Sequence, residues 1–114
     1  MIEGSFNRND SGQLVSFEIT GHAQAGPYGS DVVCAAVSAL AISTVNGIDA
    51  LAGFEPIVET NEAEGGYLYV EMLSKLNQEQ KNIAQILLEN LLLGLQSIEQ
   101  DNSEFIRIKT INKK

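Results

Sequence analysis

The chain has 114 residues, of which 44% are hydrophobic and 19% charged, and its formal net charge is −8. This length fits one compact domain, residues 1–114, and the ordinary hydrophobic content excludes a disordered chain. The negative charge argues against non-specific attraction to nucleic acid or to an anionic membrane surface, so neither is expected as a direct partner.

Secretion and membrane insertion are not expected either. The N-terminus has no basic patch followed by an apolar run, so it does not resemble a signal peptide. The longest apolar stretch, residues 32–42, is interrupted by Ser38 and is too short to span a bilayer. Because a single cysteine cannot form an internal disulfide, a reduced cytoplasmic protein is the simplest interpretation.

The first part of the sequence predicts a β-hairpin. Residues 2–8 and 14–19 alternate between apolar and polar positions, as expected of two strands with one buried face. The second strand is expected to bury Val15, Phe17 and Ile19. The segment NDSG between the strands has the composition of a tight turn.

A long apolar segment follows and predicts the first helix. Ser30 and Asp31 are good N-cap residues, because their side chains can accept a hydrogen bond from an early helix amide. The segment is rich in alanine and ends near Gly53, and apolar residues cover nearly its whole circumference. A helix of this kind is normally buried on most sides. We therefore expect it at the centre of the domain or at a dimer interface.

The second half predicts two strands, a helix and a last strand. Strands are expected at residues 57–58, 67–73 and 105–111, which are rich in β-forming residues or alternate in polarity. Asn77 with Gln80 makes a capping box for the second helix. That helix carries an apolar stripe with spacings of three and four: Ile83, Ile86, Leu87, Leu91, Leu95 and Ile98.

The predicted elements give one fold class. Their order is β-β-α-β-β-α-β, and no internal repeat or low-complexity segment divides the chain. We therefore predict a single-domain α+β fold in which two long helices pack on a largely antiparallel sheet.

The only histidine, His22, and the only cysteine, Cys34, flank one short segment. His22 follows the second predicted strand, and with Asp31 as N-cap Cys34 is the third residue of the predicted helix. The free amides and the dipole of a helix start favour the thiolate, which is the reactive form of cysteine. The same amides could bind the oxyanion that forms when a carbonyl is attacked. A cysteine nucleophile with a histidine base is one interpretation.

A purely structural interpretation explains the same residues. Cys34 can be a small core side chain, His22 a surface residue and Asp31 only a helix cap. Ser38 can bond back to a helix carbonyl, and the glycines between residues 21 and 29 can serve turns alone. One cysteine and one histidine supply half of a structural zinc set, so neither a metal nor another cofactor is predicted.

The pattern around these residues resembles the ribosomal-processing cysteine protease family, Prp. It consists of GHA (residues 21–23) after a strand, a glycine-containing loop, GSDVVCA (residues 29–35) and Ser38 one turn later. The resemblance extends over the whole chain in length and element order. The motif is specific because it fixes both residue identity and spacing.

The resemblance implies a cysteine endopeptidase. It would remove a short N-terminal extension from the precursor of a large-subunit ribosomal protein, the twenty-seventh, and so support ribosome assembly. Cys34 would be the nucleophile and His22 the general base, Asp31 would orient His22 or shape the site, and Gly21 and Ser38 would support its geometry. The resemblance also implies a homodimer and a hydrophobic, aromatic recognition motif ahead of the cut.

Residues 23–30 are predicted to form a mobile loop that closes over the substrate. Gly26, Tyr28 and Gly29 motivate this hypothesis, because turn-forming residues and an aromatic side chain between two catalytic groups suit a lid. Substrate would order the loop and bring His22 to the thiol.

Two other functions remain open on the sequence. One is a non-enzymatic, ribosome-associated binding module in which Cys34 is packed, and the other is a redox-sensing thiol. Rapid alkylation of Cys34 near neutral pH would exclude a packed cysteine. The acidic residues after the first helix are interpreted as a solvated face, with contact to a basic ribosomal substrate as the alternative. They are Glu55, Glu59, Glu62 and Glu64.

Overall fold

The structure is a computed structural model that describes residues 1–21, 28–61 and 66–112. Its elements confirm the predicted order, with a π-helical segment, η1, that continues the first helix. The elements are β1 (Ile2–Arg8), β2 (Leu14–Thr20), α1 (Tyr28–Gly47), η1 (Ile48–Ala52), β3 (Ile57–Thr60), β4 (Tyr67–Glu71), α2 (Gln78–Asp101) and β5 (Ile106–Asn112).

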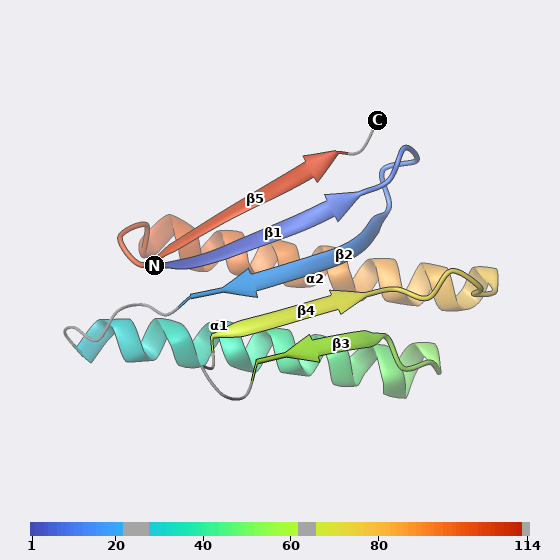
Figure 1. Cartoon of the computed structure of the whole chain (residues 1–114), viewed down its shortest axis with the longest axis horizontal. Coiled ribbons are helices and arrows are strands. Elements are labelled where there is room, and N and C mark those ends of the chain that lie inside the picture. The colour runs from blue at the N-terminus through green and yellow to red at the C-terminus, as the bar shows by residue number, and fades with distance from the viewer. Residues whose placement is uncertain (22–27, 62–65, 113–114) are drawn as a thin grey trace.

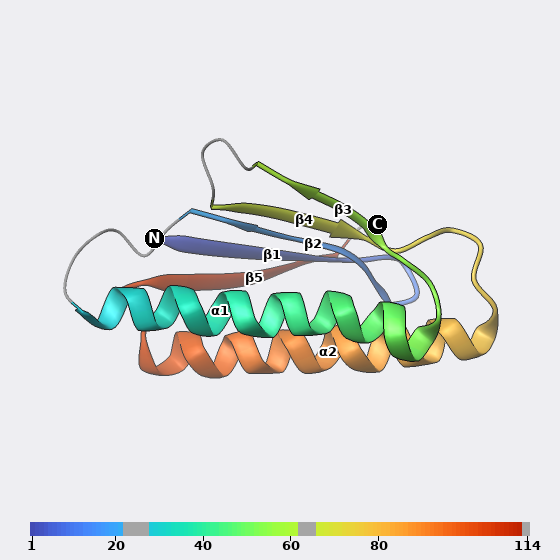
Figure 2. The ribbon, with the colours of Figure 1, turned by 90° about the horizontal axis from the view of Figure 1, so that it is seen from below.

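The five strands form one sheet in the order β3-β4-β2-β1-β5 (Figure 1). The pairs β1–β2, β2–β4 and β3–β4 are antiparallel, and only the β1–β5 pair is parallel. This arrangement confirms the predicted, largely antiparallel sheet. Both helices lie on the same face of it, so the fold has two layers (Figure 2).

The turn between β1 and β2 forms as the NDSG segment predicts. The side-chain oxygen of Asn9 accepts hydrogen bonds from the amides of Ser11 and Gln13, each 3.0 Å long. Gly12 adopts a φ of +81°, a backbone conformation that glycine enters without steric cost. The turn thus sets the two strands side by side.

An irregularity in the β1–β2 register changes the predicted core. Asn7 lies opposite Ser16, but Arg8 lies opposite Leu14. Val15 therefore has no partner of its own in the register, as in a β-bulge. Leu14 is only 1% exposed, whereas Val15 is half-buried. The prediction that Val15 occupies the core is wrong, because the extra residue reverses the alternation.

The hydrophobic core lies between the sheet and the two helices. Phe6 and Phe17 stack with their ring centroids 5.3 Å apart, and both are fully buried. Aliphatic residues from both layers surround this pair, and burial of their apolar surface is the main stabilising term of such a fold. The largest of them are Leu14, Ile48, Val70, Leu88, Leu95 and Ile106.

One side of α1 is buried, whereas the sequence predicted burial on most sides. Val32 and Ile42 of α1 and Leu51 of η1 remain 54%, 57% and 65% exposed. By length and composition alone the 21-residue stretch Val32–Ala52 could cross a membrane; its 18-residue window has a mean hydropathy of 1.6, and 28% of that window is buried in the fold. The buried positions recur every three or four residues and face the sheet and α2: Val33, Val37, Ala41, Thr44 and Ile48.

The predicted capping box of α2 is confirmed, but its apolar stripe is shifted. The side chain of Asn77 accepts from the amide of Gln80 at 2.8 Å, and the Gln80 side chain accepts from the amide of Asn77 at 3.1 Å. Ile86 was predicted on the buried stripe and is 69% exposed. The stripe is wider and rotated because α2 contacts both the sheet and α1. It consists of Ala84, Leu88, Leu91, Leu92 and Leu95.

An ion pair joins β1 to α2. Arg8 donates to both carboxylate oxygens of Glu89, at 2.5 and 3.0 Å. This hydrogen-bonded guanidinium lowers the pKa of Glu89 below its ordinary value of 4.5. A carboxyl group with a lowered folded-state pKa stabilises the fold above its unfolded-state value and loses that contribution as the pH falls through the lowered value.

The ion pair predicts a pH-dependent effect of Arg8→Gln. We expect a loss of at most about 1 kcal/mol near neutral pH, because exposed pairs are weakened by solvent and these side chains are 23% and 42% exposed. The difference from the wild type should disappear in acid, where Glu89 is protonated in both states. Urea unfolding over a series of pH values measures it. A difference that persists below the lowered pKa of Glu89 would assign the effect to packing or to the 2.9 Å hydrogen bond from Arg8 to the Gly12 carbonyl.

Candidate active site

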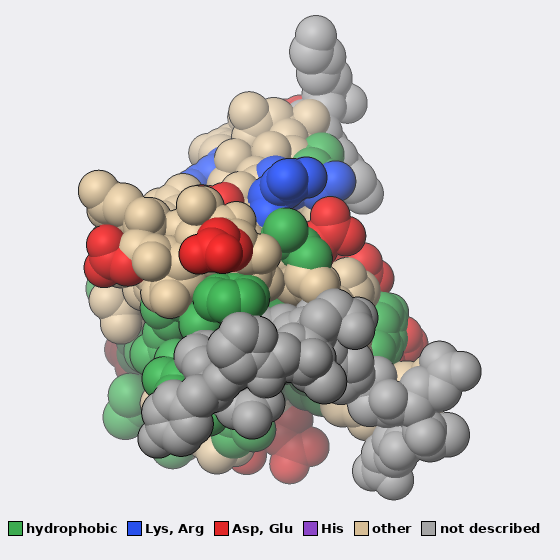
Figure 3. Space-filling view, turned by 90° about the vertical axis from the view of Figure 1, so that its left-hand side faces the viewer, with side chains coloured by type: hydrophobic (Ala, Val, Ile, Leu, Met, Phe, Trp, Pro, Cys, Tyr) green, Lys and Arg blue, Asp and Glu red, His purple; other side chains and the backbone are tan. Residues whose placement is uncertain are grey.

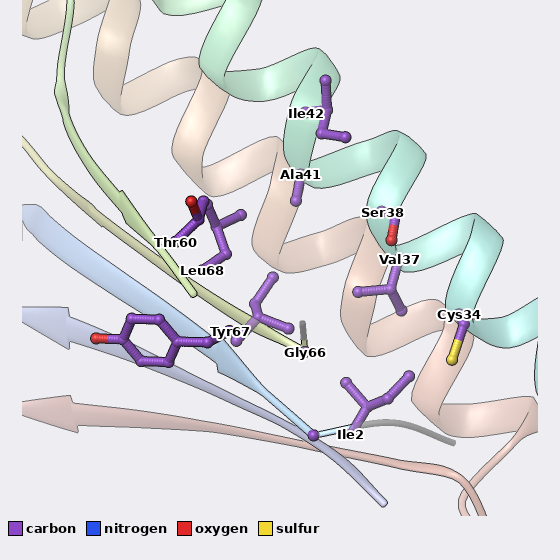
Figure 4. Close-up of a pocket in the computed structure, with 12 residues that line it drawn as sticks. Ile2, Cys34, Val37, Ser38, Ala41, Ile42, Thr60, Gly66, Tyr67 and Leu68 are labelled. Carbon is purple, nitrogen blue, oxygen red and sulfur yellow. The ribbon is translucent and has the colours of Figure 1, made fainter. Parts of the chain in front are cut away.

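A pocket of about 280 Å³ opens between α1 and the ends of several strands (Figure 4). Most of its lining is apolar, with a few polar groups, which is the usual form of a ligand site. The helix contributes Cys34, Val37, Ser38, Ala41 and Ile42, and the strands and their ends contribute Ile2, Ile19, Gly21, Thr60, Gly66, Tyr67 and Leu68.

Cys34 lies on the wall of this pocket. Its side chain is half-buried and packs against the edge of the core. In Figure 4 the sulfur points from α1 into the gap, on the side of Ile2. A thiol in this position can be reached from the pocket, which is not the enclosed environment of a packed core cysteine.

Gly21 lies at the end of β2 and lines the same pocket. Its φ is +86°, and a Cβ built on it would lie 2.3 Å from the carbonyl oxygen of Met1. Its amide donates a 2.8 Å hydrogen bond to the carbonyl of Gly66. The residue that follows Gly21 in the chain is His22. Gly21 on the pocket wall is therefore the residue to which His22 is attached in the chain.

The start of α1 differs from the prediction. The helix begins at Tyr28, so Asp31 lies inside it and is not its N-cap. Cys34 is accordingly the seventh residue of the helix and not the third. Aspartate is favourable both as a cap and within the first turn, so the sequence alone did not distinguish the two positions.

This earlier start changes the expected role of the helix amides. In an α-helix only the first four amides lack a partner within the helix. The amide of Cys34 comes after them, and the helix dipole acts mainly within the first turn. The prediction that the amides around Cys34 form the oxyanion site is therefore wrong for this structure.

The predicted site residues fall into three groups. Cys34, Ser38 and Gly21 come together at the pocket. Tyr28, Gly29 and Asp31 are residues of α1. Residues 28–30 are therefore helical, and the prediction that they belong to the loop is wrong. His22 and Gly26 lie outside the described residues, as does the remainder of the predicted loop, residues 23–27.

Comparison with known protein families gives a match over most of the chain. The family described as "Cysteine protease Prp" matches residues 1–107. The chain belongs to the Prp family of cysteine proteases. This result confirms the resemblance seen in the sequence, and it excludes the binding module without enzymatic activity.

Known proteins and solved structures are similar to this chain over nearly their full length. The ribosomal processing cysteine protease Prp of Bacillus subtilis is 39% identical over 110 residues, 96% of this chain and 97% of the relative. A crystal structure from Streptococcus mutans is 37% identical, with a TM-score of 0.87, over 99% of this chain and 96% of that one. The Prp protease of Staphylococcus aureus with a covalently linked product peptide is 33% identical, with a TM-score of 0.83, over 97% and 100% of the two chains.

The sequence did not predict which strand residues line the pocket at Cys34, called the Cys34 pocket below. Ile2, Thr60 and Leu68 line it, and they come from three different strands, β1, β3 and β4. The register places Thr20 opposite Tyr67, which brings Gly66 beside Gly21. The pairing of β2 with β4 would have been the useful signal, but the sequence does not specify which strands are neighbours.

Carboxylates lie near the two tyrosines of β4, Tyr67 and Tyr69. Desolvation raises the pKa of Tyr67, and the nearby Glu18 and Glu59 add to this effect. A 2.5 Å hydrogen bond to Glu71 raises the pKa of Tyr69. Both phenols are therefore neutral at neutral pH, and the sheet surface beside the pocket is negative. Within the described ranges no three His, Cys, Asp or Glu side chains are grouped so that they could hold a metal ion.

Proposed function

We propose that this chain removes the short N-terminal extension from the precursor of a large-subunit ribosomal protein, the twenty-seventh, and so supports ribosome assembly. The observation that carries the proposal is the reachable Cys34 sulfur in a pocket whose wall includes Gly21, the residue before His22. Relatives named ribosomal processing cysteine proteases support the substrate class. A covalently linked product peptide in one of them agrees with a cysteine nucleophile.

The proposed mechanism is acyl transfer through Cys34. His22 takes the thiol proton while the sulfur attacks the scissile carbonyl carbon, which forms a carbon–sulfur bond and an oxyanion. The oxyanion collapses, the carbon–nitrogen bond breaks, and protonated His22 gives its proton to the leaving amine. Water then attacks the thioester, His22 accepts a proton from it, and the carboxylate product leaves as the thiol is restored.

We propose the following roles for the supporting residues. Asp31 pairs with His22 when substrate is bound and stabilises the imidazolium, because an unpaired charge one helical turn from Cys34 would oppose the thiolate. Ser38 is exposed one turn after Cys34 and helps to shape the pocket. Residues 23–27 close over the peptide. A peptide mimic should reduce hydrogen exchange there, and equal exchange with and without it would contradict the lid.

We also propose a cytoplasmic homodimer. Val32 of α1 and Ile86 and Leu93 of α2 are 54%, 69% and 62% exposed, and hydrophobic side chains reach the surface in the end view of Figure 3. A second copy would remove such apolar surface from water, and a reducing compartment would keep Cys34 as a thiol. Sedimentation equilibrium should give twice the chain mass. A monomer at every concentration would contradict the dimer.

The direct test of the function is processing of a precursor. The purified chain should convert a precursor that carries its N-terminal extension into two products, and their masses should sum to that of the precursor plus one water. The mature form of the same ribosomal protein is the matched control and should remain uncut. A precursor left intact after long incubation with freshly reduced enzyme would contradict the assigned substrate.

A further inference from the structure

A second hollow lies farther along α1, away from Cys34. Its volume is about 340 Å³. It is bounded by the end of α1, the first turn of η1 and the chain that leads into β3. Its lining combines apolar walls with two carboxylates and consists of Val45, Asn46, Asp49, Glu55, Pro56 and Val58.

This second hollow, called the acidic pocket below, is lined by the same helix and the same strand as the Cys34 pocket. On the helix side Ile42 lines the Cys34 pocket and Val45 lines the acidic pocket, one turn apart. On the strand side Thr60 lines the first and Val58 the second. Val58 and Thr60 are two residues apart in β3, so they point to the same face of the sheet. The two hollows therefore share both walls, and β3 and β4 run along α1 in Figure 2.

The distance from Cys34 to the acidic pocket can be expressed as a number of substrate residues. Asp49 comes fifteen positions after Cys34 along the helical chain, which corresponds to about 22 Å at roughly 1.5 Å per residue. An extended peptide advances about 3.3 Å per residue. A peptide whose scissile bond lies at Cys34 would thus bring its sixth or seventh residue from the cut to the acidic pocket.

The lining of the acidic pocket suits a long cationic side chain. Val45, Pro56 and Val58 can contact the aliphatic part of lysine or arginine, whose charged end then remains in water near the carboxylates. Asp49 and Glu55 are both exposed at the surface. Among the described residues neither carboxylate has an ion-pair partner. A substrate cation would supply the complementary charge.

We propose that the acidic pocket is a recognition subsite for a lysine or arginine of the substrate, about six or seven residues from the scissile bond. This inference rests on the proposed function, because it takes the cut to occur at Cys34. It assigns Asp49 and Glu55 to substrate binding, at a distance from the reacting atoms. They determine the affinity for a peptide that spans both pockets and do not take part in the chemical step.

The test compares two charge-neutralised variants. Asp49→Asn/Glu55→Gln removes the carboxylates of the acidic pocket. Asp10→Asn/Glu104→Gln removes the same number of charges from exposed residues that line neither pocket. Each pair is also introduced into a Cys34→Ala chain, so that peptide binding can be measured without cleavage.

The probes are peptides with the cleavage sequence of the precursor and one lysine six or seven residues from the cut, on its amino or its carboxyl side. The matched peptides carry norleucine in place of that lysine. Calorimetry with the Cys34→Ala chain should show about fivefold tighter binding of one lysine peptide. Asp49→Asn/Glu55→Gln should abolish this preference, and Asp10→Asn/Glu104→Gln should retain it.

Cleavage kinetics separate this inference from the proposed function. With active enzyme the preference should appear in KM, with kcat unchanged, and it should weaken at high salt because exposed charges are screened. If neither lysine peptide is preferred, or if the preference survives in Asp49→Asn/Glu55→Gln, the subsite is refuted. Tighter lysine binding without any cleavage would refute the proposed cut at Cys34 and retain the acidic pocket as a cation site.

Discussion

Replacing Cys34 by Ala is expected to reduce peptide cleavage by on the order of 10⁴-fold or more, because the acyl-enzyme can no longer form. The fold should remain, since the cysteine is only half-buried and alanine is the smaller residue. The measurement is kcat/KM on a precursor peptide, together with circular dichroism and thermal unfolding of each variant.

The control for Cys34→Ala is Ser43→Ala. Ser43 is exposed on α1 and does not line the pocket, so this variant should cleave like the wild type. His22→Ala should lower kcat while Cys34 remains available for alkylation. Wild-type rates in the Cys34→Ala enzyme would show that another group performs the chemistry.

Replacing Gly21 by Ala is expected to destabilise the fold by about 2–4 kcal/mol and to impair cleavage in the molecules that still fold. Two effects add. A residue other than glycine is strained at a φ of +86°, and the new Cβ would lie 2.3 Å from the carbonyl oxygen of Met1. The backbone would have to move, and this movement would displace the attachment point of His22.

Gly12→Ala separates the two effects. Gly12 has a similar φ of +81°, but a Cβ there has no atom within 4 Å. Only the cost of the backbone conformation applies, about 1 kcal/mol, and Gly12 does not line the Cys34 pocket. Urea unfolding gives both differences. Equal losses for the two variants would show that the close approach of Gly21 to Met1 does not matter.

Local patterns in the sequence predicted most of the fold. Alternation identified the strands, and the reciprocal bonding of Asn77 and Gln80 is a local signal that the structure confirms. The errors arose where tertiary packing overrides a local signal. The irregularity in the β1–β2 register, which buries Leu14 in the core where Val15 was expected, depends on the partner strand. The exposure of Ile86 depends on which side of α2 faces the sheet.

The candidate site could be predicted from the sequence only in part. Cys34 was predicted as a site residue because it is the only cysteine of the chain. Gly21 was predicted because it belongs to the GHA motif that follows a strand. The strand side of the pocket could not be predicted, and Glu55 was named only as an alternative contact for a basic substrate, because the position of β3 and β4 along α1 is not a local signal. With Asp31 as N-cap, the start of α1 was predicted four residues late, because Ser30 and Asp31 have cap chemistry that also suits a first turn.

The central claim is that the Cys34 sulfur, reached through the pocket, forms the covalent bond to the substrate. It is tested most directly by treating the enzyme with a chloromethyl ketone of the peptide that precedes the cut, followed by intact mass measurement and peptide mapping. We predict one adduct per chain, located on Cys34, with loss of precursor cleavage in proportion to labelling. Fully labelled Cys34 in an enzyme that still cuts the precursor, or inactivation with the adduct on another residue, would contradict the account.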